Sequence, residues 1–283
     1  MREENISDSE IRIVGSSQKP TQKPFPWGWV VVGVVLVACL GVILWWQYSK
    51  TNAEQESIGV FEQEQPVVQT YPLTEWFASV DSITAVGTVT TDITINDIPL
   101  RVYLPLNSVP HLEVGYGVTK KCQNSILFFQ AADVRADNGK IVGAFVLQGK
   151  PLSWGLSKRG FCAILDRGVS IGVTDNSPLF EKATEEGGDF FRQYPLVDNG
   201  RLVENELKNK SIRRALCEIN AHIVVVETQS VESMHDFSQA LVDLGAQNAI
   251  YLVGSSAMGW SMDIHGNGTK RGLWDPRKIK NIS

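Results

Sequence analysis

The order of apolar and polar residues predicts a helix between strands near the C-terminus. From Val231 to Leu244 the apolar residues recur at three- and four-residue steps, which is the period of one helical face. Ser233 and Asp236 resemble a capping box at its start, and Gly245 is a natural C-terminal stop. Apolar and β-branched runs predict strands over 211–219, 222–227 and 248–253.

The preceding part of the chain reads as a series of short strands. Asp137-Asn-Gly139 and Asp198-Asn-Gly200 are tight-turn sequences between apolar runs, a pattern typical of β-hairpins. The predicted strands, rich in β-branched or apolar residues, cover 83–95, 100–104, 125–129 and 141–147. Many short strands with one clear helix late in the chain predict a strand-rich α+β domain with few helices.

Residues 27–48 form a long uncharged run that predicts a transmembrane helix before this domain. About 20 apolar residues span the hydrocarbon core of a bilayer, and Trp or Tyr residues stand at both ends of the run. A cleaved signal peptide has a shorter apolar core. The segment around Cys39 resembles a lipoprotein acylation box, but the apolar run continues beyond it, which favours an uncleaved anchor.

Charges around the run predict its orientation. Arg12, Lys19 and Lys23 precede it with no acid between them. Lys50, by contrast, is followed by Glu54 and Glu56. The positive-inside bias therefore places the N-terminus in the cytoplasm. The expected organisation is a cytoplasmic tail (1–26), a single membrane span (27–48), a polar stem (49–69) and one extracytoplasmic domain (70–283).

Composition changes this interpretation little. The net charge of -5 gives no support for nucleic acid as a partner, because phosphate binding needs a surplus of Lys and Arg. Cys122, Cys162 and Cys217 permit at most one disulfide within the domain, and their spacing matches no zinc site. We therefore favour buried free thiols, with no metal site and no evident cofactor; a divalent metal stays an open alternative.

Several motifs occur in an order and spacing that resemble the phosphodiester glycosidase family. Tyr194-Pro-Leu-Val-Asp-Asn-Gly200 resembles a Pro-Leu-Val…Gly segment of that family, and Arg213-Arg-Ala-Leu-Cys217 stands where the family has Arg-Thr-Ala-Ile-Gly. The other segments of the resemblance are 138–143, 148–150, 161–168 and 244–252. The resemblance covers about half of the chain. It implies a protein that acts on sugar-1-phosphodiesters or related glycans.

Two signature motifs of that family are changed in this chain. Gln130-Ala-Ala-Asp-Val134 stands where the family has Asn-Gly-Gly-Phe-Phe, and Val253-Gly-Ser-Ser-Ala257 replaces Asp-Gly-Gly-Gly-Ser. Valine cannot serve as an acid, a base or a metal ligand, unlike the aspartate expected at that position. The changes favour loss of the family's usual reaction.

The resemblance still implies a set of candidate site residues. Arg213 could hold a phosphate or carboxylate through its planar fork, and Glu218 is a further candidate carboxylate. The candidate catalytic residues are Asp133, Asp198 and Arg213. The candidate substrate-binding residues are Gln130, Gly254, Ser255 and Ser256.

Other chemistry is poorly supported. The run from Gly254 to Gly259 has one residue too many for a G-x-S-x-G nucleophile elbow, and Asp263 with His265 gives two metal ligands without a third. Two function classes therefore remain open. One is a membrane-anchored hydrolase of glycan phosphodiesters; the other is a catalytically inactive scaffold that binds a glycan or a protein partner.

Overall fold

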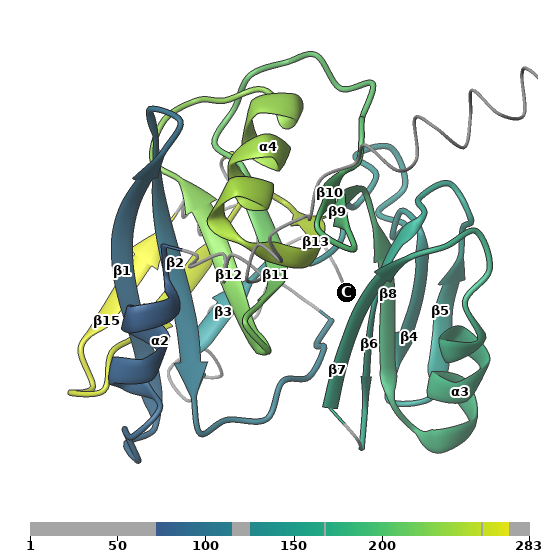
Figure 1. Ribbon diagram of the computed structural model, residues 1–283. Helices are drawn as coiled ribbons and strands as arrows, with labels where there is room; N and C mark the ends of the chain where they lie inside the picture. The colour runs from purple at the N-terminus through teal and green to yellow at the C-terminus, as the bar shows by residue number, and fades with distance from the viewer. Residues whose placement is uncertain (1–71, 115–124, 167, 256, 272–283) are drawn as a thin grey trace, which may run out of the picture. The chain divides into compact units, whose positions relative to one another are not determined.

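The computed structural model of the chain (Figure 1) describes residues 72–114, 125–166, 168–255 and 257–271. These residues belong to one compact unit, Gln69–Ser283. Within these ranges, no helix is both long and apolar enough to cross a membrane. The predicted span at 27–48 and the preceding tail lie outside the described residues.

The largest element is a seven-stranded sheet in which every described neighbouring pair is antiparallel. Successive strands along the chain form its hairpins, and β13 is inserted between β11 and β9. In sheet order its strands are β1 (Gly87–Ile95), β2 (Ile98–Leu106), β12 (His222–Thr228), β11 (Arg214–Ile219), β13 (Ala246–Leu252), β9 (Pro195–Asp198) and β10 (Arg201–Leu202).

Two smaller antiparallel sheets complete the described strands. The five-stranded sheet consists of β5 (Lys150–Trp154), β4 (Ala144–Leu147), β8 (Asp189–Gln193), β6 (Gly160–Leu165) and β7 (Gly168–Val173), in that order. The three-stranded sheet consists of β15 (Gly268–Arg271), β14 (Gly259–Met262) and β3 (Leu127–Phe129). Together with three short helices, these sheets confirm the strand-rich α+β class.

One hydrophobic core cluster lies between the sheets, and a larger one lies between the seven-stranded sheet and the helices that cover it. Tyr103 and Val225 of the seven-stranded sheet are buried in one cluster with Phe145 and Phe191 of the five-stranded sheet, and Phe129 of β3 packs against it. Burial of such apolar surface is the main favourable term in folding.

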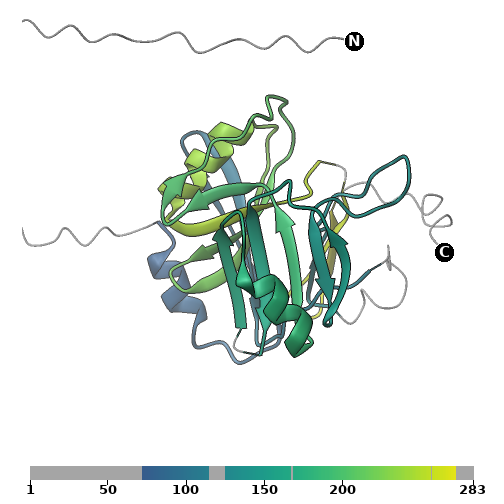
Figure 2. The ribbon, with the colours of Figure 1, turned by 90° about the vertical axis from the view of Figure 1, so that its right-hand side faces the viewer.

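The outer faces of the two larger sheets are covered by helices, as Figures 1 and 2 show. The helix α4 (Met234–Leu244) buries Phe237 and Leu241 against the seven-stranded sheet, and α2 (Thr74–Val80) adds Phe77 to the same cluster. The helix α3 (Pro178–Glu186) packs on the five-stranded sheet.

The predicted helix near the C-terminus is confirmed together with its caps. The Ser233 side chain accepts a hydrogen bond from the Asp236 N–H, and Gly245 ends α4 in the left-handed conformation with φ 100°. The hairpin predicted at Asp198-Asn-Gly200 joins β9 to β10, with positive φ at both Asn199 and Gly200. Local side-chain and backbone preferences are sufficient for both features.

The strand predicted over 211–219 is shorter in the structure. β11 begins at Arg214, because the Ile212 carbonyl accepts from Ser255 N–H and the Arg213 N–H donates to the hydroxyl of Thr228. The backbone just before β11 therefore bonds both to Ser255, which follows β13, and to Thr228 at the end of β12.

Candidate functional site

Two segments with family-like positions meet in the fold. The β3 loop (residues 130–134) follows β3, and the β13 loop (residues 253–258, of which Ser256 lies outside the described residues) follows β13. The Val253 N–H donates to the Gln130 carbonyl at 3.0 Å. The β3 loop and the β13 loop are therefore in direct backbone contact.

A polar cluster adjoins the β3 loop. The Lys158 ammonium donates to Asp133 Oδ2 at 2.5 Å and to Gln193 Oε1 at 2.8 Å, and it lies 4.6 Å from the centroid of the Tyr194 ring. The amide of Gln193 donates in turn to Asp133 Oδ2 at 3.2 Å and to the Ala131 carbonyl at 3.3 Å. Lys158 is only 3% exposed, so its charge needs this carboxylate.

Asp133 supplies the carboxylate of the cluster, and it is partly exposed. Its side chain is 37% exposed although Oδ2 is engaged by Lys158. Among the described residues, no hydrogen bond reaches its other oxygen, Oδ1. An ionised carboxylate can accept further hydrogen bonds. Oδ1 can therefore accept a hydrogen bond from a hydroxyl group of a ligand that approaches from the solvent.

The β13 loop has a fixed backbone. A Cβ atom at Gly254 would lie 2.2 Å from the Ile212 carbonyl oxygen, so only glycine fits there. The Gly254 N–H donates to the Tyr251 hydroxyl at 3.2 Å. Ser255 is exposed and adopts a positive φ of 54°, which is uncommon for a residue other than glycine. Ser255 can therefore present its hydroxyl at the surface.

Asp198 and Glu218 lie at the opposite end of β13. Asn248, near the start of that strand, donates to Glu218 Oε2 at 2.9 Å and accepts from the Asn199 N–H beside Asp198 at 3.2 Å. Asn248 precedes Val253 by five residues, or about 16 Å of strand. The structure therefore does not bring Asp198 or Glu218 together with Asp133.

Arg213 is buried beside the β13 loop, but its side chain is directed elsewhere. Its Nε donates to the Glu232 carbonyl at 3.0 Å and its Nη2 to the Asn209 carbonyl. None of its described hydrogen bonds goes to a candidate carboxylate. The Arg213 guanidinium thus links the backbone at Asn209 to the backbone at Glu232.

Three polar residues of this region were not expected from the sequence. Lys158 and Gln193 form the cluster with Asp133, and Arg214 donates to two carbonyls of the β13 loop. Gln193 ends β8, which alternates little between polar and apolar residues (Asp-Phe-Phe-Arg-Gln), and Lys158 stands in a short connection. The double arginine at 213–214 was the only signal in the sequence that pointed towards Arg214.

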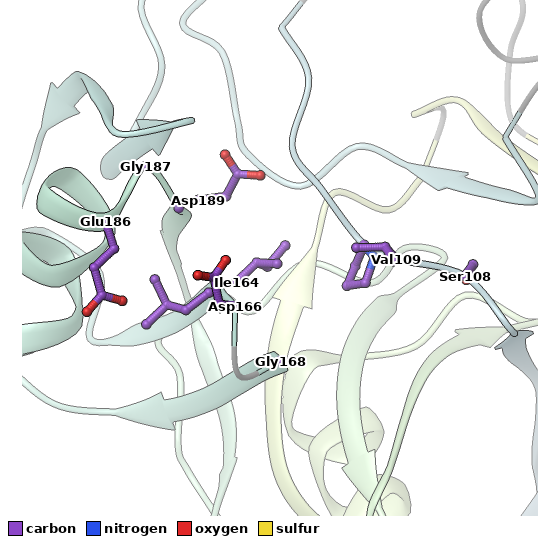
Figure 3. A pocket seen from close by; sticks show the side chains of 11 residues that line it. Ser108, Val109, Ile164, Asp166, Gly168, Glu186, Gly187 and Asp189 are labelled. Atoms are coloured by element: carbon purple, nitrogen blue, oxygen red, sulfur yellow. The ribbon is translucent and has the colours of Figure 1, made fainter.

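A separate cavity of about 470 Å³ lies at the other end of β8 (Figure 3). Ser108–Pro110, Ile164–Asp166, Gly168 and Glu186–Asp189 line it. Asp189 is buried, and its two oxygens accept from the N–H groups of Leu112 at 2.8 Å and Gln148 at 2.7 Å. This carboxylate ties two loops to the sheet.

The thiols of Cys162 and Cys217 are free and fully buried, as the sequence predicted; Cys122 lies outside the described residues. Burial raises the pKa of Cys162 to about 12 and also raises that of Cys217, since the charged thiolate is disfavoured without water. Both therefore stay protonated at neutral pH. The described part of the chain contains no group of three or more His, Cys, Asp or Glu side chains that could hold a metal ion.

Comparison with solved structures places the chain in a known strand-rich α+β fold. A hypothetical protein from Synechocystis matches with a TM-score of 0.50 at 14% identity; the match covers 66% of this chain and 59% of that protein, less than two thirds of its length. At this identity the likeness shows the fold alone.

The catalytic domain of zebrafish N-acetylglucosamine-1-phosphodiester alpha-N-acetylglucosaminidase, auto-inhibited by its pro-peptide, matches with a TM-score of 0.49 at 15% identity. That match covers 65% of this chain and 74% of the zebrafish chain. No protein-family model matches the sequence, and no curated protein matches it.

Proposed function

We propose that this chain binds glycans, sugar-1-phosphodiesters among them, where the β3 loop meets the β13 loop. The observation that carries the proposal is the position of Asp133. Its carboxylate is partly exposed, it is held by Lys158, and it belongs to the loop that contacts Val253. The sequence resemblance to the phosphodiester glycosidase family supplies the class of ligand.

Binding is favoured over hydrolysis by the carboxylates of this region. Glycoside hydrolases usually use two carboxyl groups on either side of the bond that breaks. Here Asp133 is one exposed carboxylate, whereas Val253 stands where the family has aspartate. Glu227, which lies behind the β13 loop, is buried and paired with Arg214. The family's usual reaction is therefore lost or very weak in this proposal.

The proposed place of binding is outside the cytoplasm, with the chain anchored in the membrane through residues 27–48. The charge asymmetry around that run supports this orientation. Protease added to the outer side of intact cells or spheroplasts is expected to digest the domain and spare the N-terminal tail. Protection of the domain would contradict this orientation and leave the site itself untouched.

The function is tested on the full-length chain purified in detergent. Calorimetry with UDP-N-acetylglucosamine, a soluble sugar joined at C1 to a phosphate ester, is expected to show binding that Asp133→Asn weakens. Asp198→Asn is the matched control, because that carboxylate lies at the other end of β13. Equal affinity of the two variants would reject the site.

The same preparation is assayed for sugar release, with and without an added divalent metal ion. We expect no turnover above background. A rate of about 1 per second or faster, ordinary for an enzyme, would show that the chain is a hydrolase and not a binding protein.

A further inference from the structure

The β13 loop is held from its inner side by one guanidinium group. Arg214 Nη1 donates to the Val253 carbonyl at 3.2 Å and to the Ala257 carbonyl at 2.8 Å. Arg214 is only 1% exposed, so a ligand in solution cannot contact it directly. One nitrogen atom thus joins the first residue of the loop to a residue four positions later.

A carboxylate fixes the direction of this guanidinium. Arg214 and Glu227 are opposite one another in the β11–β12 pairing, and Arg214 Nε donates to Glu227 Oε2. The face of the guanidinium lies near the Phe129 ring, with 5.1 Å between Cζ and the ring centroid. The Glu227 carboxylate accepts from Nε and the loop carbonyls accept from Nη1, so they bind different nitrogens of the planar, rigid guanidinium.

The carbonyls of Val253 and Ala257 depend on this contact, because the other described hydrogen bonds of the loop use its N–H groups and the Gly254 carbonyl. The Ser255 N–H donates to Ile212, and the Ala257 N–H donates back to the Gly254 carbonyl at 3.1 Å. For the carbonyls of Val253 and Ala257, Arg214 is the donor that the structure describes. Carbonyl groups that lose a donor inside a protein are costly to leave unpaired.

We propose that Arg214 is the positioning residue of the β13 loop and that Glu227 orients it. In this role Arg214 acts on the ligand only through the loop backbone, and the part of the inference that concerns the ligand rests on the proposed function. By the sequence resemblance, Arg214 stands where the family has threonine. The arginine and the altered loop sequence thus occur together in this chain.

The chain provides a matched control in the neighbouring arginine. Arg213 is also buried and also donates to two carbonyls, those of Glu232 and Asn209, but neither belongs to the β13 loop. Replacing either arginine by lysine keeps the charge and removes the planar fork. A difference between the two variants therefore reports on the loop contact and not on loss of a buried arginine.

The experiment compares the full-length chain with Arg214→Lys, Glu227→Gln and Arg213→Lys. Hydrogen exchange is followed in the peptide that covers residues 253–258 and in the α4 peptide as an internal reference. We expect Arg214→Lys to raise exchange in the loop about tenfold, with a smaller rise in Glu227→Gln, since losing one hydrogen bond changes an equilibrium by roughly this factor. Arg213→Lys should leave the loop unchanged, and α4 should be unchanged in all three.

Affinity for UDP-N-acetylglucosamine is measured in parallel and should fall about tenfold in Arg214→Lys. Unchanged loop exchange in both Arg214→Lys and Glu227→Gln would overturn the inference, as would an equal rise in Arg213→Lys. If Arg214→Lys unfolds as a whole, the milder Glu227→Gln decides the result. Altered loop exchange in a chain that binds no probe would reject the proposed function and support the positioning role.

Discussion

The two ends of strand β8 carry polar residues of different kinds. At one end Gln193 bonds Lys158 and Asp133, and the Asp133 carboxylate faces the solvent. At the other end Asp189 is only 5% exposed, and both of its oxygens are bonded to backbone N–H groups beside the cavity of Figure 3. The first end has an oxygen available for a ligand, whereas the second has its carboxylate fully used.

This difference shows that a cavity alone does not identify a binding site. The hollow at the Asp189 end is large enough for a small ligand. Its most buried polar group, however, already has the partners that a buried carboxylate requires. The Gln193 end offers a carboxylate with one oxygen engaged and one oxygen open. The two ends therefore differ in the carboxylate nearest to β8: Asp133 has an oxygen without a described partner, whereas both oxygens of Asp189 have partners. The other carboxylates of the cavity, Asp166 and Glu186, lie exposed at its lining.

The largest expected effect follows from Asp133→Ala. This change leaves the Lys158 ammonium buried without its counter-charge, which is expected to lower the free energy of unfolding by about 3–5 kcal/mol. Lys158→Met should cost less, because the Asp133 carboxylate that it leaves behind is partly hydrated. Urea unfolding of both variants measures the difference.

The double variant Asp133→Ala with Lys158→Met provides the control. It removes both charges, so it should be more stable than Asp133→Ala alone. A double variant that is less stable than either single variant would show that the pair does not behave as a buried ion pair, and the contrast between the two ends of β8 would weaken.

A smaller effect is expected from Asp189→Asn. The amide group of asparagine keeps one acceptor oxygen and places an NH2 group against a backbone N–H of Leu112 or Gln148. The free energy of unfolding should fall by about 1–3 kcal/mol. Affinity for UDP-N-acetylglucosamine should stay the same, and a clear loss of affinity would assign ligand binding to the cavity end instead.

The sequence was informative where a local pattern determines the structure. Ser233 and Gly245 identified both ends of α4, and Asp198-Asn-Gly200 identified a hairpin, because capping and turn formation involve residues close in sequence. The helix α3 was missed although Ser177 caps it and Pro178 opens it. Its short length and weakly apolar face left no clear period.

The candidate site depended on contacts between residues distant in sequence. Asp133 and Lys158 are 25 positions apart, and Lys158 and Gln193 are 35 apart, so no spacing rule links them. Arg213 and Arg214 are indistinguishable by residue type. In the structure Arg214, the first residue of β11, contacts Glu227 and the β13 loop. Arg213, just before that strand, contacts instead the carbonyls of Asn209 and Glu232. The pairing of β11 with β12 shows that Arg214 is the arginine opposite Glu227.

The smallest expected effect is that of Val253→Asp, which introduces into the β13 loop the aspartate that the phosphodiester glycosidase motif has at the corresponding position. Losing an acid–base group typically costs about 10²- to 10⁴-fold in rate, so adding one alone could be expected to restore activity. The Val253 backbone, however, is already held by Gln130 and Arg214, and the β3 loop keeps its alanines. Catalytic groups that act as a unit are not additive.

We therefore expect sugar release by Val253→Asp to change less than tenfold, and Val253→Asn controls for the altered packing without adding a charge. Hydrolysis of UDP-N-acetylglucosamine by the full-length chain, with and without a divalent metal ion, is the measurement. Turnover of about 1 per second or faster in Val253→Asp alone would show that the Gln193 end of β8 retains a nearly complete active site. The lost reaction would then trace to one side chain, and the arrangement of Asp133, Lys158 and Gln193 would have to be regarded as catalytic machinery and not as a binding surface.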